Sequence, residues 1–349
     1  MWIINAFFAA LLLPLAGLAA GAYLALHDGA AEMALPLEKL EPALAAVKKD
    51  ALALERNIGF IRETAEEQRR RYREQDRILA ELAGKSYSQK KLSDEIYEQL
   101  ILDRLGPPIG EHRSERVEIK VFELRELGYR GYIAKVKLLD PTAFKVVLGR
   151  DTLGERETTS AAVQRTGAVL GINGGGFYRT VRDGKERMLP TGNTVIDGRL
   201  VGRFSPSHNG LAFAGVDSTG ELVGGAFYEK DSLMRLKPLA GVSFIPALIK
   251  NRRPLPIPEK WQHQKHPRTI LGEYGNDDLI MMVVDGRRAG WSSGVTLEDL
   301  QIKLIHLGVI EAYNLDGGGS STFVFKDKVL NRPSDGRERP VVTNIVIMP

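Results

Sequence analysis

Cysteine is absent from the 349 residues of this chain. Disulfide bonds, thiolate metal sites and cysteine nucleophiles are therefore excluded. The absence does not place the protein inside the cell, because an exported chain with a large enough core is stable without disulfides. With 43% hydrophobic and 26% charged residues, the composition is that of a protein that buries a core.

Basic stripes with interleaved aromatic residues are also missing, so the sequence gives no reason to expect nucleic acid as a partner. The formal net charge of +4 is unevenly distributed. Residues 1–110 carry 14 basic and 16 acidic side chains, whereas the remainder carries 34 and 28. A mildly basic C-terminal region is suited to an anionic partner, such as a phosphate-bearing glycan or a membrane surface.

Charge is absent altogether from Trp2 to Leu26. A run of roughly 25 uncharged residues is long enough to cross a hydrocarbon core as a helix. We therefore predict a transmembrane signal anchor over residues 1–27, with a cleaved signal peptide as the alternative. The anchor predicts a single-pass protein of the cell membrane with its remaining residues outside the cytoplasm.

Glycine is scarce between residues 36 and 105, where it occurs only at Gly59 and Gly84. Apolar residues recur there at helical spacings of three, four and seven. The pattern predicts a helical, coiled-coil stalk over 36–105 that spaces the following domain from the membrane and could pair two chains into a homo-oligomer. The alternative is a pair of helices that pack on each other or on the main domain.

Beyond Pro108 the apolar pattern changes towards a period of two, which predicts strands. Asp197-Gly198 between two short apolar runs indicates a hairpin. Thr296 is a suitable N-cap for a helix that ends near Leu307, and residues 279–284 form a buried-strand run. Residues 110–349 are thus predicted to form an α+β domain of mixed twisted β-sheets with flanking helices.

Two glycine loops, each directly after an apolar run, are the strongest candidates for a site. The first has Asn173 before Gly174, Gly175 and Gly176, and the second has Asp316 before Gly317, Gly318, Gly319 and Ser320. Consecutive glycines permit positive φ angles and close approach to a ligand. Successive N–H groups can then form an anion-binding concavity, whereas the structural alternative is a pair of tight turns.

Four further residues could take part in chemistry. Arg268 could bind a phosphate with two hydrogen bonds, and Asp285 ends a buried strand. Glu298 lies in the first turn of the predicted helix, where it could equally well complement the helix dipole. Arg339 closes an Arg-rich segment near the C-terminus.

These motifs, in this order, resemble the phosphodiester glycosidase family over roughly residues 115–349. The matching segments are Ile172–Phe177, the hairpin at Asp197-Gly198, Arg268–Gly272, Val284–Arg287, the helix around Thr296 to Leu300, Asn314–Ser321 and Leu330–Arg339. The resemblance implies hydrolysis of a sugar-1-phosphodiester bond, releasing a sugar such as N-acetylglucosamine.

In such a reaction two carboxyl groups are commonly needed. The resemblance implies Asp316 as the first choice, with Asp285 and Glu298 as the others, and leaves open whether Asp316 is nucleophile, base or metal ligand. Asn173 would orient sugar or water. Arg268, Arg339, Ser320 and the glycine N–H groups would neutralise the phosphate. No cofactor is required, although a divalent cation such as calcium is compatible with the carboxylates.

The anchor and stalk point to a substrate in the cell envelope or in exopolysaccharide. Two other classes of function remain open at this point. One is a non-catalytic phosphoglycan-binding module displayed on the stalk, and the other is a membrane scaffold whose main task is assembly through the coiled coil.

Overall fold

The computed structural model describes residues 23, 48, 68–74, 88–182 and 185–349. The chain divides into two compact units, residues 1–73 and 74–349. In the first unit the described residues 68–73 are helical. Apart from Tyr23, the predicted anchor lies outside the described residues, and so does most of the predicted stalk. Within the described part, no helix is long and apolar enough to span a bilayer.

The largest sheet of the second unit has eight strands in the order β1-β2-β3-β16-β15-β17-β13-β14. Their bounds are β1 Gly110–Arg113, β2 Val117–Glu126, β3 Tyr129–Leu138, β13 Ala247–Lys250, β14 Arg253–Pro254, β15 Arg268–Tyr274, β16 Leu279–Val284 and β17 Val309–Asn314.

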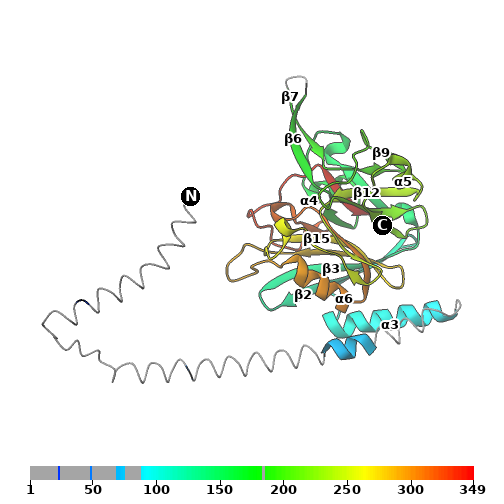
Figure 1. Cartoon of the computed structure of the whole chain (residues 1–349). Coiled ribbons are helices and arrows are strands. Elements are labelled where there is room, and N and C mark those ends of the chain that lie inside the picture. The colour runs from blue at the N-terminus through cyan, green and yellow to red at the C-terminus, as the bar shows by residue number, and fades with distance from the viewer. Residues whose placement is uncertain (1–22, 24–47, 49–67, 75–87, 183–184) are drawn as a thin grey trace. The chain divides into compact units, whose positions relative to one another are not determined.

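Two five-stranded sheets and a hairpin complete the strands. One sheet runs β11-β10-β12-β8-β9, with β8 Val195–Ile196, β9 Arg199–Leu200, β10 Ala212–Asp217, β11 Leu222–Gly225 and β12 Pro238–Phe244. The other runs β19-β18-β5-β20-β4, with β4 Phe144–Leu148, β5 Leu170–Asn173, β18 Phe323–Phe325, β19 Lys328–Val329 and β20 Thr343–Ile347. The hairpin β6 (Phe177–Arg182) and β7 (Lys185–Pro190) extends away from the other sheets (Figure 1).

Four α-helices accompany the sheets within 88–182 and 185–349. They are α3 Ser88–Leu105, α4 Thr159–Thr166, α5 Lys230–Met234 and α6 Leu297–His306. Short 3-10 turns are η1 Pro141–Ala143, η2 Gly149–Asp151, η3 Glu259–Trp261 and η4 Gly318–Ser320. Thr296 caps α6 as predicted, since its hydroxyl accepts a hydrogen bond from the Asp299 N–H at 3.1 Å.

The predicted mixture of strands and helices is confirmed, but the sheets are not mixed in direction. Each pairing between described strands is antiparallel. Short turns join many of the neighbours, and a tight turn can only return a strand antiparallel. The turn at Asp197-Gly198 is of this kind, because its two residues have φ of 47° and 74°, as a type I′ hairpin requires.

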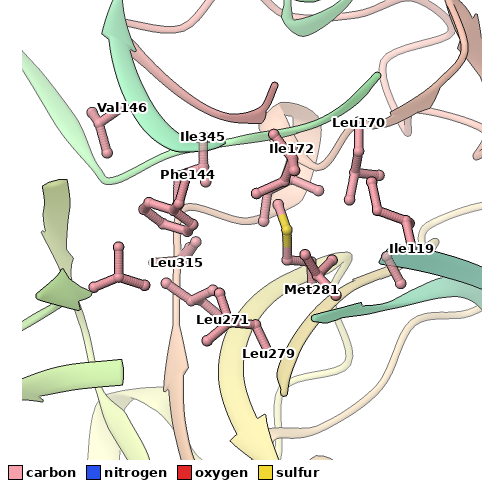
Figure 2. Close-up of a cluster of buried hydrophobic side chains, with 14 of the residues drawn as sticks. Ile119, Phe144, Val146, Leu170, Ile172, Leu271, Leu279, Met281, Leu315 and Ile345 are labelled. Carbon is pink, nitrogen blue, oxygen red and sulfur yellow. The ribbon is translucent and has the colours of Figure 1, made fainter. Parts of the chain in front are cut away.

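Both faces of the large sheet are buried. Along β16, Leu279, Met281 and Val283 face one core, whereas Ile280, Met282 and Val284 face the other, as the alternation of a strand dictates. The first core lies between the large sheet and the two five-stranded sheets, and Figure 2 shows its side chains from opposite layers meeting. The second core is covered by α3 and α6 (Figure 1).

Helix α3, at the C-terminal end of the predicted stalk, packs on the large sheet of the second unit. Tyr97 and Ile101 are 1% and 0% exposed in the second core. Beside them, Glu98 lies 2.5 Å from Lys120 and 3.3 Å from Lys135, and Lys135 also pairs with the buried Asp278. For residues 88–105 this is the packing of the alternative interpretation, and the role of the rest of 36–105 stays a prediction.

Candidate active site

The candidate residues converge because neighbouring antiparallel strands begin and end at the same edge of the large sheet. Arg268 begins β15 and pairs with Val284, the last residue of β16, so that Asp285 follows at once. Strand β17 pairs with β15 on the other side and ends at Asn314, two residues before Asp316. Arg268, Asp285 and Asp316 are therefore brought to one edge by the strand order.

Asn173 joins the two glycine loops. It is fully buried at the end of β5, and its Nδ2 donates a hydrogen bond to the Asp316 carbonyl oxygen at 2.6 Å. Its Oδ1 accepts hydrogen bonds from the Thr269 hydroxyl at 2.8 Å and from the Thr322 N–H at 3.1 Å. Asn173 thus positions the second loop, and the orientation of sugar or water that the resemblance implies for it stays a prediction.

The first glycine loop does not form the expected anion-binding concavity. The Gly174 N–H donates to the Thr343 carbonyl oxygen, that of Gly175 to the Thr343 hydroxyl and that of Gly176 to the Ser243 carbonyl oxygen, at 2.9, 3.1 and 3.2 Å. Nor does any of the three have a positive φ. Glycine is required instead by packing, since a Cβ at Gly175 would lie 2.7 Å from the Ser243 carbonyl oxygen.

The second glycine loop is the more open of the two. Gly318 has the positive φ that was expected, 63°, and its N–H donates to the Pro267 carbonyl oxygen at 3.0 Å. The space beside Gly319 is filled by the ends of two side chains, since a Cβ there would overlap Arg339 Nη2 and Asp335 Oδ2. These two atoms form an ion pair at 2.7 Å, so Arg339 is held directly against the loop.

Asp316 is a half-buried carboxyl at the start of this loop. Burial raises its pKa to about 6, and the nearby Ser320 hydroxyl, the Arg339 charge and the Gly317 N–H oppose that rise. Ser320 itself is buried, and its hydroxyl is near enough to the Asp316 carboxyl to lower that pKa. The Ser320 Oγ does not reach hydrogen-bond geometry with any described residue. A carboxyl that ionises near neutrality beside a cation is suited to acid–base chemistry.

Arg268 lies deeper than the other cations of the site. It is 2% exposed, and its Nη2 and Nε donate to the carbonyl oxygens of Gln264 and Val295 at 2.7 and 3.4 Å. Burial lowers its pKa to about 10, while the Glu298 charge acts in the opposite direction. No carboxylate lies within ion-pair distance of Arg268 in the described part of the chain, which leaves a buried cation available to an anionic ligand.

Asp285 is held by the protein itself. Its oxygens accept hydrogen bonds from the Trp291 indole N–H at 2.8 Å, the Asn331 amide at 3.0 Å and the Arg332 N–H at 3.0 Å. Burial raises its pKa, and these donors oppose the rise. The carboxylate thus anchors two loops beside the site, and its catalytic role stays a prediction.

Glu298 lies at the N-terminal end of α6, as expected. Its Oε1 accepts a hydrogen bond from the His263 N–H at 3.1 Å, and its Oε2 is buried without a partner among the described residues. It is the anionic neighbour of Arg268. The structure therefore brings Glu298 together with Arg268, and brings Asp316 together with Arg339 and Ser320.

Sequence reasoning missed Arg287 and His266 as members of the site. The Arg287 guanidinium lies against Gly318, with its Nη1 3.4 Å from where a Cβ would stand. Its Nη2 is 3.3 Å from His266 Nδ1. The pKa of His266 is lowered by burial and by the charges of Arg287 and Arg268. Arg287 directly follows the Asp285-Gly286 pair, so its position in the motif was the available signal.

The sequence requires no cofactor and is compatible with a divalent cation, and both points stay predictions. Within the described ranges, no three His, Asp or Glu side chains gather around one point.

Comparison with known proteins identifies the family of this chain. The phosphodiester glycosidase family model matches residues 166–348. Mouse N-acetylglucosamine-1-phosphodiester alpha-N-acetylglucosaminidase is 29% identical over 250 residues, which cover 66% of this chain and 46% of that protein. The SPbeta prophage-derived uncharacterized protein YomE of Bacillus subtilis is 32% identical over 198 residues, covering 55% and 30%.

A solved structure shares the fold. It is the catalytic domain of zebrafish N-acetylglucosamine-1-phosphodiester alpha-N-acetylglucosaminidase auto-inhibited by its pro-peptide, with a TM-score of 0.56, 24% identity, and coverage of 69% of this chain and 87% of that one. This chain spans less than half the length of the curated relatives it matches. The family model nevertheless covers more than half of this chain, which therefore belongs to the phosphodiester glycosidase family.

Proposed function

We propose that this protein hydrolyses a glycosyl phosphodiester of the N-acetylglucosamine-1-phosphate type, carried by a glycan of the cell envelope or exopolysaccharide. The observation that carries the proposal is Asp316, a half-buried carboxyl with a pKa raised to about 6 next to Arg339 and the second glycine loop. Family membership and the names of the animal relatives support the reaction class.

In the proposed reaction, the Asp316 carboxylate takes a proton from a water molecule whose oxygen attacks the anomeric carbon. The bond from that carbon to the phosphate oxygen breaks, and the leaving group keeps its electron pair as a phosphomonoester. Because a phosphomonoester is a good leaving group, it needs little protonation. A base with a pKa close to the working pH combines adequate basicity with a high ionised fraction.

The departing phosphate gains negative charge, which nearby cations would stabilise. Arg339 is already held against Gly319, on the same loop as Asp316. Arg268 is a buried guanidinium that forms no ion pair with a described carboxylate. Ser320 has a buried hydroxyl beside Asp316 that does not reach hydrogen-bond geometry with any described residue. We assign the phosphate to these three side chains, and Glu298 to the positioning of Arg268.

The proposal also includes a location in the cell membrane and a possible pairing of two chains. Residues 1–27 would anchor the protein in the cell membrane as a single-pass segment, with the hydrolase outside the cytoplasm. Residues 36–87 would space it from the membrane and could join two chains.

The test is hydrolysis by the full chain of a synthetic N-acetylglucosamine-1-phosphodiester with a methyl acceptor, followed by release of free sugar. Asp316→Asn should lower kcat/KM by about 100- to 10,000-fold, the usual contribution of a general base. Asp327→Asn, at an exposed turn, is the matched control and should retain activity. Binding without turnover by the folded parent chain would instead favour the phosphoglycan-binding module.

A further inference from the structure

Next to the proposed catalytic loop lies a group of arginines that the reaction itself does not use. Arg130 and Arg332 both lie over the Trp291 ring, with guanidinium carbons 4.6 and 3.6 Å from its centroid. Arg287 and Arg288 line a shallow hollow of about 470 Å³ with the same tryptophan. We call these four arginines and Trp291 the arginine platform.

The guanidinium groups of the platform form no ion pairs among the described residues. Within the described ranges, none of its four guanidinium groups has a carboxylate oxygen within 4.0 Å. By contrast, Arg339 nearby is paired with Asp335, and Arg125 with Glu123. Asp285 and Asp335 attract Arg288 and Arg287 only from beyond ion-pair distance. Four like charges without ion-pair partners repel each other, so their arrangement favours an anionic ligand that relieves the repulsion.

The platform is also pre-organised. The Asp285 carboxylate accepts hydrogen bonds from the Trp291 indole N–H at 2.8 Å and from the backbone N–H of Arg332 at 3.0 Å. The Ser292 hydroxyl donates to the Asp285 carbonyl oxygen at 2.6 Å and accepts from the Arg130 N–H at 3.2 Å. A guanidinium that lies over an indole face keeps its edge N–H groups free to bind a phosphate with two hydrogen bonds. Little side-chain entropy would therefore be lost on binding.

The platform is continuous with the proposed catalytic loop. Arg287 lies against Gly318, two residues beyond Asp316. The segment that begins with Arg332, on the tryptophan, continues to Arg339, against Gly319. A substrate that places its scissile bond at Asp316 would thus have an acceptor portion extending over the platform.

From this geometry, and resting on the proposed function, we infer that the arginine platform is a subsite for a second phosphate on the acceptor side of the scissile bond. The substrate class would then be a glycan or acceptor with more than one phosphate. A lone glycosyl phosphodiester with a neutral acceptor would fill only the catalytic loop.

The test uses the full chain and two synthetic N-acetylglucosamine-1-phosphodiesters, one with a methyl acceptor and one whose acceptor ends in a phosphomonoester. The double variant Arg130→Gln/Arg332→Gln should lower kcat/KM for the phosphate-bearing acceptor by about 10- to 100-fold, mainly through KM, as the loss of charged hydrogen bonds predicts. It should leave the methyl ester within about twofold. Arg199→Gln, exposed on β9, is the matched control.

Equal losses on both esters, or no loss on either, would overturn the subsite. Calorimetric titration with the phosphate-bearing ester keeps the two proposals separate. If the parent chain hydrolyses neither ester but binds this one, and the double variant binds it at least tenfold more weakly, the proposed reaction fails and the platform stands as a phosphate-binding site. If the double variant instead loses binding to phosphatidylglycerol vesicles while its affinity for the phosphate-bearing ester is unchanged, the platform is a membrane-facing surface and the subsite is refuted.

Discussion

The same substitution in the two glycine loops should have opposite consequences. Neither Gly175 nor Gly319 has a positive φ, so alanine is allowed at both by the backbone and only the surrounding space differs. At Gly175 the new methyl would lie 2.7 Å from the Ser243 carbonyl oxygen and 3.0 Å from Val242 Cβ. Both belong to β12, and the backbone of a paired strand cannot move aside cheaply.

Gly175→Ala should therefore lower the free energy of unfolding by about 1–3 kcal/mol, the usual cost of overpacking. At Gly319 the three atoms nearest to the new methyl belong to the ends of Arg339 and Asp335, which can rotate away. The free energy of unfolding of Gly319→Ala should stay within about 1 kcal/mol of the parent. Because Arg339 would be displaced from the loop, kcat/KM should fall by about 10- to 100-fold, as expected for a lost charged hydrogen bond.

Urea denaturation followed by tryptophan fluorescence measures the first quantity, and release of sugar from the methyl phosphodiester measures the second. Each variant is the control for the other, since the chemical change is identical. The reasoning is refuted if Gly175→Ala is as stable as the parent chain. It is refuted equally if Gly319→Ala loses more stability than Gly175→Ala, or keeps full activity.

Three further outcomes are expected. Ile101→Ala in α3 should lower the free energy of unfolding by about 2–5 kcal/mol because Ile101 is fully buried. The control Ile302→Ala, at a 46% exposed position, should lower it by less than about 1 kcal/mol. Equal urea midpoints for the two variants would show that α3 does not belong to the second unit. Burial raises the pKa of Glu273 from 4.5 to about 7, so the folded state loses stability as pH rises from 4.5 through 7. Glu273→Gln should therefore raise the free energy of unfolding by about 1–3 kcal/mol at pH 9 and hardly change it at pH 4, as thermal melts can check. With Asp316 as base, kcat/KM should fall about tenfold per pH unit below its pKa of about 6, and a flat profile down to pH 4 would exclude that role.

Much of the local structure could be predicted from the sequence. The hairpin at Asp197-Gly198 and the start of α6 at Thr296 were predictable because positive φ angles and capping hydrogen bonds depend on residues a few positions apart. The buried strand at 279–284 was equally predictable, since a strand buried on both faces has a continuous apolar sequence. The motif around Asp316 was sufficient to indicate the family.

Tertiary structure alone decided which polar groups of the site are hydrogen-bonded within the protein and which are available to a ligand. The N–H groups of the first glycine loop are taken by Thr343 and Ser243, far away in sequence, and Asp285 is satisfied by Trp291 and Asn331. In the second loop, which has a similar sequence, the atoms nearest Gly319 are the side-chain ends of Arg339 and Asp335. Whether a polar group is available to a ligand depends on which distant segments have already satisfied it. Those partners are set by strand order and side-chain packing, which no local pattern encodes.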